Sequence, residues 1–402
     1  MVKDQCDVLI LSASYGGGHN QVARALTQAL QLQAPGIKVA TVNFCDLLVP
    51  FFSRLSQFGY LQTIRHFRVG YALYYQVTGN ISPDSFWQRR LNRIGAAELN
   101  LMVRRIMPRV IVSTFPLPAG VLSHMKESGE INQPLVTAIT DICVHSQWIH
   151  PGTDLYIVGS EEVAAGLNGR GIPRESIAVT GIPILPAFNQ LQPPEPVRVK
   201  YRVEPHDKVI VFMGGSDGMF GTTRFSQILT GLSENIKAFI ITGSNQELYE
   251  KLTFSHGRQP NLRILSYVEN VAELMGIADI LVTKAGGITI SEALAKGVPM
   301  IIYKPAPGQE EANANYLWRH RAAIIAKGER RLKSAIARMV HDENFRQRFR
   351  KNCLKIGTPA SAEASAREIL RLITPTTRYT TFLPSTTVWS VEKGYLNEVT
   401  PI

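Results

Sequence analysis

Short runs of apolar, often β-branched residues alternate along the chain with longer segments whose apolar residues recur at helical spacing. The first apolar run covers residues 8–11, and it is followed by segment 20–33, in which Val22, Leu26 and Leu30 fall on one helical stripe. This alternation predicts repeated βαβ units and therefore parallel sheets covered by helices.

The alternation occurs twice, on either side of a proline-rich break between Pro183 and Pro196. Predicted strands lie at 8–11, 38–43, 110–113, 135–140 and 155–158 before the break, and at 209–213, 238–242, 263–267, 280–282 and 300–303 after it. Predicted helices of the second half lie at 222–232, 270–276, 289–296 and 312–319. The pattern predicts an α/β fold of two Rossmann-like domains at 1–184 and 201–373, with a linker at 185–200 and a tail at 374–402. Ligands of such sheets bind at the carboxyl ends of strands, so we expect the ligand in the cleft between the domains.

Composition supports a globular chain with an anionic partner. Of the 402 residues, 45% are hydrophobic and 19% charged, which excludes a disordered protein, and the formal net charge is +11. Basic residues concentrate at 51–110 and 319–355. Anionic lipid or phosphate-bearing substrates would explain this charge, and so would solvated helix faces.

The four cysteines form no CxxC pair and suit free thiols in a reducing cytoplasm. No apolar run reaches the roughly 18 residues that a membrane span needs, and the first residues lack the pattern of a signal peptide. We therefore expect any membrane contact to be peripheral.

Three glycine turns occur between a predicted strand and a helix, where backbone N–H groups can meet phosphate. The first, at 14–19, ends in Gly18 and His19, and a neutral imidazole there could accept a proton from a hydroxyl. An ordinary turn with an exposed histidine is the alternative. The second turn consists of Gly214, Gly215, Ser216, Asp217, Gly218 and Met219, and it also fits a plain tight turn.

The third turn is the most specific. Gly286 and Gly287 follow a strand, and a helix is expected to begin at Thr289, with its dipole and hydroxyl facing a diphosphate. Glu292 could then accept both hydroxyls of a ribose. A capping box between Thr289 and Glu292 has the same spacing and is the alternative.

Polar residues also follow the prolines at 305–307. Gln309, Glu310 and Asn313 suit hydrogen bonds to sugar hydroxyls, although an ordinary helix start has the same composition.

The four elements in this order, with the block Asp141, His145, Trp148 between them, resemble bacterial processive diacylglycerol glucosyltransferases and plant monogalactosyldiacylglycerol synthases over residues 8 to about 372. The enzyme that adds N-acetylglucosamine to lipid I is a more distant resemblance. The resemblance implies the GT-B architecture, in which two Rossmann-like domains face each other across a cleft. It also implies transfer from UDP-glucose or UDP-galactose to diacylglycerol, with no metal cofactor and no nucleic-acid partner.

The same resemblance implies roles for individual residues. His19 matches the catalytic base, with Asp141 as a possible assistant. The acceptor side is expected to include Tyr15, His145 and Trp148. The donor site is expected to include Gly18, Gly214, Gly215, Ser216, Asp217, Gly218, Met219, Val268, Lys284, Gly286, Gly287, Thr289, Glu292, Gln309, Glu310 and Asn313.

An inverting displacement needs a base and stabilisation of the departing UDP. The chain contains no Asp-x-Asp pair for a metal, and the histidines and cysteine near Asp141 match no common zinc spacing, so helix starts and backbone are expected to stabilise the diphosphate. Aromatic residues and arginines between 49 and 75 favour peripheral contact with the cytoplasmic face of an anionic membrane, or two packed helices.

Three alternatives remain open at this point. A UDP-N-acetylglucosamine 2-epimerase or a peptidoglycan-type N-acetylglucosaminyltransferase would share the fold and the nucleotide site. A non-catalytic UDP-sugar sensor would not need His19.

Overall fold

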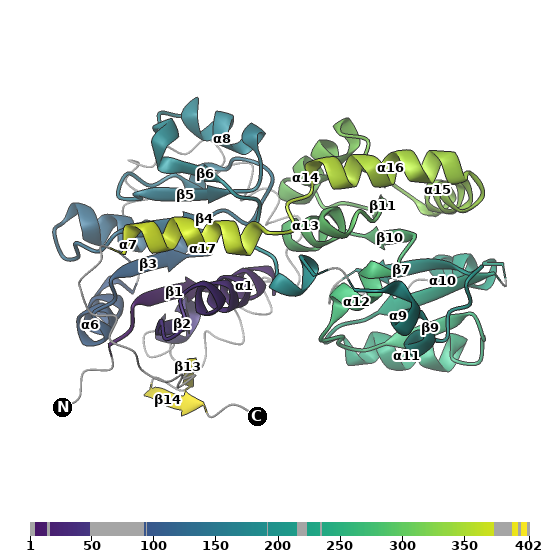
Figure 1. The fold of residues 1–402 in the computed structure, drawn as a ribbon, viewed down its shortest axis with the longest axis horizontal. Coiled ribbons are helices and arrows are strands. Elements are labelled where there is room, and N and C mark those ends of the chain that lie inside the picture. Colours follow the sequence, from purple (N-terminus) through teal and green to yellow (C-terminus); the bar gives the residue numbers. More distant parts are fainter. Residues whose placement is uncertain are drawn as a thin grey trace. The chain divides into compact units, whose positions relative to one another are not determined.

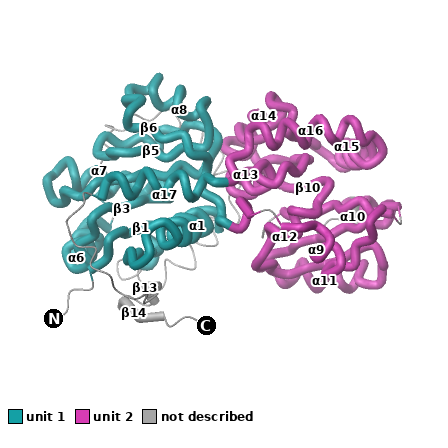
Figure 2. The backbone as a smooth tube through the Cα atoms, in the orientation of Figure 1, with its two compact units in different colours: residues 1–186, 360–402 teal, residues 187–359 magenta. Residues whose placement is uncertain are grey.

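The computed structural model describes residues 5–13, 17–48, 92–93, 95–190, 192–214, 223–233, 235–373, 388–392 and 395–399. The chain forms two compact units, one from residues 1–186 with 360–402 and one from residues 187–359 (Figure 2). Each contains a sheet of parallel strands with helices, as the alternating pattern predicts, and the sheet of unit 1 also includes one antiparallel pair (Figure 1). None of the helices in this described part of the chain is long and apolar enough to cross a membrane.

The sheet of unit 1 has the strand order β14-β13-β2-β1-β3-β4-β5-β6. Its strands are β1 (Val8–Ser12), β2 (Val39–Asn43), β3 (Val110–Ser113), β4 (Leu135–Ala138), β5 (Leu155–Val158), β6 (Ile177–Val179), β13 (Val388–Glu392) and β14 (Tyr395–Val399). Its helices are α1 (Gly18–Gln33), α2 (Phe44–Leu48), α6 (Ala96–Ile106), α7 (Pro116–Glu127), η1 (Ser146–Trp148), α8 (Glu161–Asn168), η2 (Arg174–Ser176) and α17 (Ser361–Leu372). Every residue of β1, β3, β4 and β5 is buried, because helices cover both faces of a parallel sheet.

The sheet of unit 2 has the strand order β12-β11-β10-β7-β8-β9, and all its pairs are parallel. Its strands are β7 (Lys208–Met213), β8 (Ile236–Ile241), β9 (Leu262–Leu265), β10 (Ile280–Thr283), β11 (Met300–Tyr303) and β12 (Ala323–Ala326). Its helices are η3 (Pro186–Phe188, which begins at the boundary), α9 (Pro194–Tyr201), α10 (Thr223–Thr230), α11 (Gln246–His256), α12 (Val271–Gly276), α13 (Gly287–Lys296), α14 (Gln309–Arg319), α15 (Glu329–His341) and α16 (Glu343–Ile356).

The predicted domain boundaries differ from the observed units in one respect. Helix α17 falls within the predicted second domain but belongs to unit 1, where it packs on α1. Gln33 Nε2 donates to the Glu363 carbonyl over 2.6 Å, and the hydroxyls of Thr180 and Ser365 lie 2.8 Å apart. These contacts join residues that are far apart in the sequence. The proline-rich break is a local feature and therefore could not indicate that α17 returns to unit 1.

Two segments expected to lack regular structure contain elements. The predicted linker 185–200 includes most of α9, because proline is accepted in the first turn of a helix, where its missing N–H would have no helical partner. The predicted tail contains β13 and β14, which pair with each other in antiparallel orientation.

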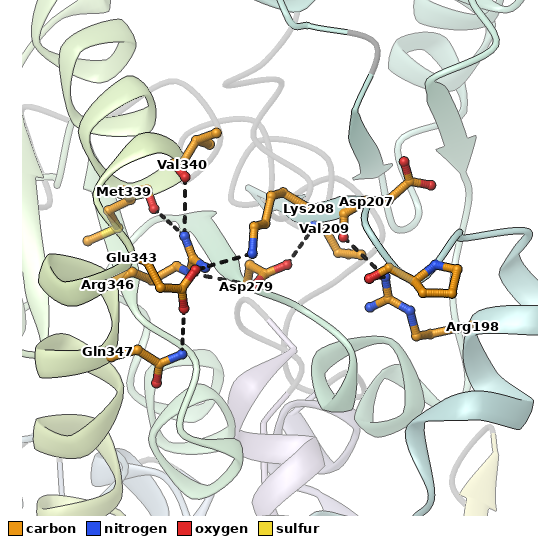
Figure 3. Close-up of polar contacts among 11 residues, drawn as sticks. Arg198, Asp207, Lys208, Val209, Asp279, Met339, Val340, Glu343, Arg346 and Gln347 are labelled. Atoms are coloured by element: carbon orange, nitrogen blue, oxygen red, sulfur yellow. Dashed lines mark hydrogen bonds and ion pairs between the residues drawn. The ribbon is translucent and has the colours of Figure 1, made fainter.

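A buried arginine links helices α15 and α16 to the amino ends of β7 and β10 in unit 2 (Figure 3). Arg346 of α16 is 3% exposed, and its Nη1 donates to the Met339 carbonyl of α15 over 2.6 Å. It also pairs with Glu343 and, over 3.5 Å, with Asp279, whose other oxygen accepts the Val209 N–H. The glycine turns after β7 and β10 lie at the opposite ends of these strands, their carboxyl ends.

Candidate active site

His19 lies at the carboxyl edge of the unit 1 sheet, as the second residue of α1. The helix begins after Gly17, whose φ of 76° lies in the left-handed region that favours glycine. Strands β1, β3 and β4 are neighbours in the sheet, so residues that follow β3 and β4 arrive beside the start of α1. Thr114 and Thr140 are the residues that meet His19 in this way.

Hydrogen bonds fix the tautomer of His19. Its Nδ1 lies 2.7 Å from the carbonyl oxygen of Thr114 and 3.3 Å from the hydroxyl of Thr140. A carbonyl can only accept, so Nδ1 carries the proton and Nε2 presents a lone pair. Thr114 is itself held, because its hydroxyl donates to the carbonyls of Leu11 and His19 over 3.4 and 3.3 Å.

Aromatic rings surround the imidazole. Phe115 makes an edge contact with it at 4.9 Å between centroids, and the Trp148 ring lies at 6.4 Å. Burial lowers the pKa of His19 from 6.5 to about 4, against the opposing effect of the Thr114 hydrogen bond. The imidazole is therefore neutral at pH 7 and is oriented to accept a proton at Nε2.

The segment after β4 is buried. Asp141 and His145 are 4% and 6% exposed, and Trp148, which contacts His19, is 2% exposed. His145 caps η1, because its Nδ1 accepts the Gln147 N–H over 3.3 Å. The structure thus brings Trp148 to His19, while roles of Asp141 and His145 toward an acceptor stay predictions.

In unit 2, α13 begins two residues earlier than the sequence suggested. Gly286 occupies the N-cap position with φ −72° and ψ 132°, and no side chain caps the helix. Thr289 is therefore inside the first turn, and the alternative of a capping box between Thr289 and Glu292 is wrong. The start at Gly287 leaves the first N–H groups of the helix directed at the loop after β10.

The loop after β10 lies beside the loop after β7, since these strands are neighbours. The Thr283 hydroxyl lies 2.5 Å from the Met213 carbonyl, directly before buried Gly214. Two of the predicted glycine turns therefore begin at the same edge of the sheet.

Glu292 is a buried carboxyl group in the second turn of α13. It is 7% exposed, and no described residue gives it a hydrogen bond or an ion pair. Burial raises its pKa from 4.5 to about 8. Such a group costs stability unless a ligand provides hydrogen bonds.

The start of α14 is joined to the loop after β10 through Glu310 and Asn313. Lys284 Nζ lies 3.4 Å from Glu310 Oε1, and Glu310 Oε2 accepts the Ala306 N–H over 2.9 Å. Asn313 donates to the Ala285 carbonyl over 3.0 Å and is fully buried. Asn313 therefore supports the loop from inside, and its direct contact with a sugar stays a prediction.

The remaining predicted donor residues lie on loops and helix starts. Gly18 begins α1, Gln309 begins α14, and half-buried Val268 lies between β9 and α12. Tyr15, the glycine-turn residues Gly215, Ser216, Asp217, Gly218 and Met219, and the predicted membrane segment 49–75 fall outside the described residues.

Thr114, Thr140 and Phe115 were missed by sequence reasoning. The two threonines are 95 and 121 residues from His19, and no local motif marks them. The available signal was positional: Thr114 directly follows a predicted strand, and Thr140 is the last residue of another predicted strand in the same sheet.

Two family models match the chain. Residues 19–184 match the model of monogalactosyldiacylglycerol (MGDG) synthase, and residues 195–355 match glycosyl transferases group 1. The chain is 32% identical over 371 residues to a processive diacylglycerol beta-glucosyltransferase of Bacillus subtilis, an alignment that covers 90% of this chain and 94% of the relative. A Bacillus licheniformis enzyme of the same name is 31% identical, with the same coverage.

Solved structures show the fold. Acinetobacter baumannii MurG superimposes with a TM-score of 0.58 at 14% identity, covering 91% of this chain and 99% of that one. Anabaena HepE in complex with UDP and glucose gives 0.54 at 14% identity, over 91% and 100%. A Neisseria meningitidis UDP-GlcNAc 2-epimerase gives 0.61 at 11% identity, over 91% and 100%. These structures confirm the GT-B fold. At such low sequence identity, however, structural similarity does not distinguish a glycosyltransferase from an epimerase.

Proposed function

Because the chain belongs to the family of processive diacylglycerol beta-glucosyltransferases and is a glycosyltransferase, we propose that it transfers glucose or galactose from a UDP-sugar to 1,2-diacylglycerol. The product would then carry a β-linked sugar, and the resulting glycolipid could accept a second one. The family membership argues against the epimerase and the sensor as the main activity.

The observation that carries the proposal is Glu292. A carboxyl group that is 7% exposed and has no partner among the described residues lies one turn behind the glycine start of α13. The two hydroxyls of a ribose would supply the missing hydrogen bonds, and the N–H groups at the start of α13 would bind the diphosphate. This arrangement supports a nucleoside diphosphate as ligand of unit 2.

His19 supports the chemistry of transfer. Its Nε2 would accept the proton of the acceptor hydroxyl as that oxygen attacks the anomeric carbon from the side opposite UDP. The bond to the diphosphate breaks, and the charge on the departing UDP is stabilised by the start of α13. The α-linked donor would thus give an inverted product without a metal ion.

A lipid acceptor requires the enzyme to work at a membrane. The basic composition supports peripheral binding to an anionic surface, which we propose to be the cytoplasmic face of the cell membrane.

The direct test is incubation with diacylglycerol liposomes and either UDP-glucose or UDP-galactose, in buffer containing EDTA. Mass spectrometry of the lipids should show a mass increase of one hexose with at least one donor. Absence of hexosylated lipid with both donors, in protein that binds UDP, would contradict diacylglycerol as the acceptor. Transfer that needs an added divalent cation would contradict the metal-free mechanism.

A further inference from the structure

Helices α15 and α16 of unit 2 carry many exposed cations. The two helices are consecutive and pack against each other, and Figure 1 shows them side by side in unit 2. Seven exposed basic side chains project from them: Arg330, Arg331, Lys333, Arg338, Arg348, Lys351 and Lys355. These residues are called the α15–α16 basic face below.

The acidic residues of the two helices are already used. Glu329 pairs with Lys304 over 2.8 Å, and Asp342 accepts the Phe345 N–H over 2.8 Å as the cap of α16. Glu343 pairs with buried Arg346 and, over 3.3 Å, with Lys208. None of the seven basic side chains has a hydrogen bond or ion pair with another residue in the part of the chain that the structure describes.

Two of these cations gather around one ring. The guanidinium carbon of Arg338 lies 3.9 Å from the centroid of Phe345, and that of Arg348 lies 5.8 Å from it. The ring stabilises each cation, but two like charges on one ring repel each other. An anion bound between the two helices would remove this repulsion, and guanidinium groups suit phosphate because they can donate two parallel hydrogen bonds.

Arg346 of α16 differs from the seven exposed cations, because it is buried and makes polar contacts within unit 2. Its donors reach the carbonyls of Met339 and Val340 and the carboxylates of Glu343 and Asp279 (Figure 3). The seven exposed cations show no such contacts, so their positions are not explained by the fold of unit 2.

An apolar side chain stands within the basic face. Leu354 is 53% exposed, and it lies on α16 three residues after Lys351 and directly before Lys355. Cations beside an exposed apolar side chain suit the headgroup region of an anionic bilayer, where both find a partner. We propose that the α15–α16 basic face docks on an anionic phospholipid surface. The choice of a lipid surface over other polyanions rests on the proposed lipid acceptor.

The proposal predicts strong dependence on charge and salt. Near an anionic membrane each Lys or Arg contributes enough that loss of two should lower the vesicle partition coefficient by roughly thirtyfold. Added salt should reduce binding in the same way, because the attraction falls off within a Debye length.

The test is cosedimentation of the full chain with phosphatidylcholine vesicles, with and without phosphatidylglycerol. Two variants are compared with the wild type: Arg338→Gln with Arg348→Gln, and Lys351→Gln with Lys355→Gln. The two lysines are exposed and make no hydrogen bond or ion pair with the described residues, so this variant should fold normally even if loss of the arginines around Phe345 destabilises the first one. Arg258→Gln with Arg263→Gln removes two exposed charges elsewhere in unit 2 and is the matched control.

Both test variants should bind phosphatidylglycerol vesicles much more weakly than the control, with unchanged affinity for UDP. Equal binding by the lysine variant and the control would overturn the proposal. A second contradicting outcome is loss of binding to duplex DNA in the test variants while vesicle binding stays normal. UDP affinity and hexose transfer to detergent-dispersed diacylglycerol are measured on the same samples, so failure of the proposed function is seen separately.

Discussion

His19 in unit 1 and Glu292 in unit 2 are both titratable groups whose pKa values burial shifts, and the protein surrounds them in opposite ways. The His19 ring donates a hydrogen bond to the Thr114 carbonyl and lies beside the Thr140 hydroxyl. Two aromatic rings also neighbour it. Glu292 receives no polar partner from the described residues. The His19 ring is therefore already oriented in the free protein, whereas we propose that Glu292 gains its hydrogen bonds from a bound ligand.

From this contrast we propose a division of roles between the two units. A proton acceptor must be oriented in advance, because its contribution depends on the angle and distance of one lone pair. A ligand-binding carboxyl group can be left unsatisfied in the free protein, and its hydrogen bonds then add to the affinity for the ligand. In this proposal, unit 1 supplies the proton acceptor and unit 2 supplies the nucleotide binding.

The largest expected effect comes from removing the base. His19→Ala should lower the rate of hexose transfer by about 10³-fold, because Nε2 is the proposed proton acceptor. The matched control is His206→Ala, since the His206 side chain is 76% exposed. Rates are measured by mass spectrometry of lipid products under initial-rate conditions. Full activity of the His19 variant would mean that another group accepts the proton.

Glu292→Gln should raise stability at high pH. The unfolded carboxyl ionises near 4.5, whereas in the folded protein its pKa is about 8. Between these values the unfolded state releases a proton that the folded state keeps, so rising pH destabilises the wild type by up to about 1.4 kcal/mol per pH unit. The uncharged glutamine removes this dependence, and the variant should be more stable than the wild type at pH 8 by about 4 kcal/mol, but not at pH 4.5.

Urea unfolding at the two pH values measures this effect. Glu329→Gln is the opposite case, because the Lys304 hydrogen bond holds the pKa of Glu329 down to about 2. The ionised form of Glu329 is the stabilising one above pH 4.5, so this variant should lose stability at pH 8. A Glu292 variant that also loses stability at pH 8 would show that the protein itself satisfies the carboxylate.

Gly286→Ala tests whether the start of α13 is open for a ligand. A Cβ at this position would meet no protein atom within 4 Å, and the backbone angles suit any residue, so the free energy of unfolding should stay unchanged. A methyl group near a diphosphate should still weaken UDP binding by about tenfold, as expected for a lost close approach. Gly17→Ala in unit 1 should instead lower the free energy of unfolding by about 1–2 kcal/mol, because φ is 76° there. Normal UDP affinity of the Gly286 variant would move the diphosphate away from this turn.

The smallest expected effect concerns the attachment of α14. Glu310→Gln keeps an oxygen for the Ala306 N–H but removes the ion pair with Lys284, a pair that is partly exposed on both sides. A change of about threefold in the donor KM with little change in kcat is expected, as for loss of one partly exposed ion pair. A large fall in kcat would instead assign Glu310 a direct contact with the reacting sugar.

The elements of the fold were largely predictable, because strands buried on both faces read as continuous apolar runs. Strands β3, β5 and β11 were predicted with the observed bounds. The start of α13 was set two residues late because the glycine pair was assigned to the turn, whereas Gly287 already belongs to the helix. Helix α17 was assigned to the wrong unit because its partners lie more than 170 residues away.

The site was only half predictable. Its glycine turns and the carboxyl group follow from local order along the chain, since each comes directly after a strand. The groups that set the tautomer of His19 come from two other strands and become visible only in the folded sheet. The burial of Asn313 and its hydrogen bond to the Ala285 carbonyl could not be read from its residue type, because they depend on how α14 packs on the loop after β10.

Isothermal titration of UDP into the wild type, His19→Ala and Glu292→Gln tests the division of work most directly. The His19 variant should bind UDP as tightly as the wild type, and the Glu292 variant should bind it at least about tenfold more weakly, since the hydrogen bonds between the ribose hydroxyls and the carboxyl group are lost. The reverse order, with UDP affinity dependent on His19 and indifferent to Glu292, would contradict the assignment of nucleotide binding to unit 2.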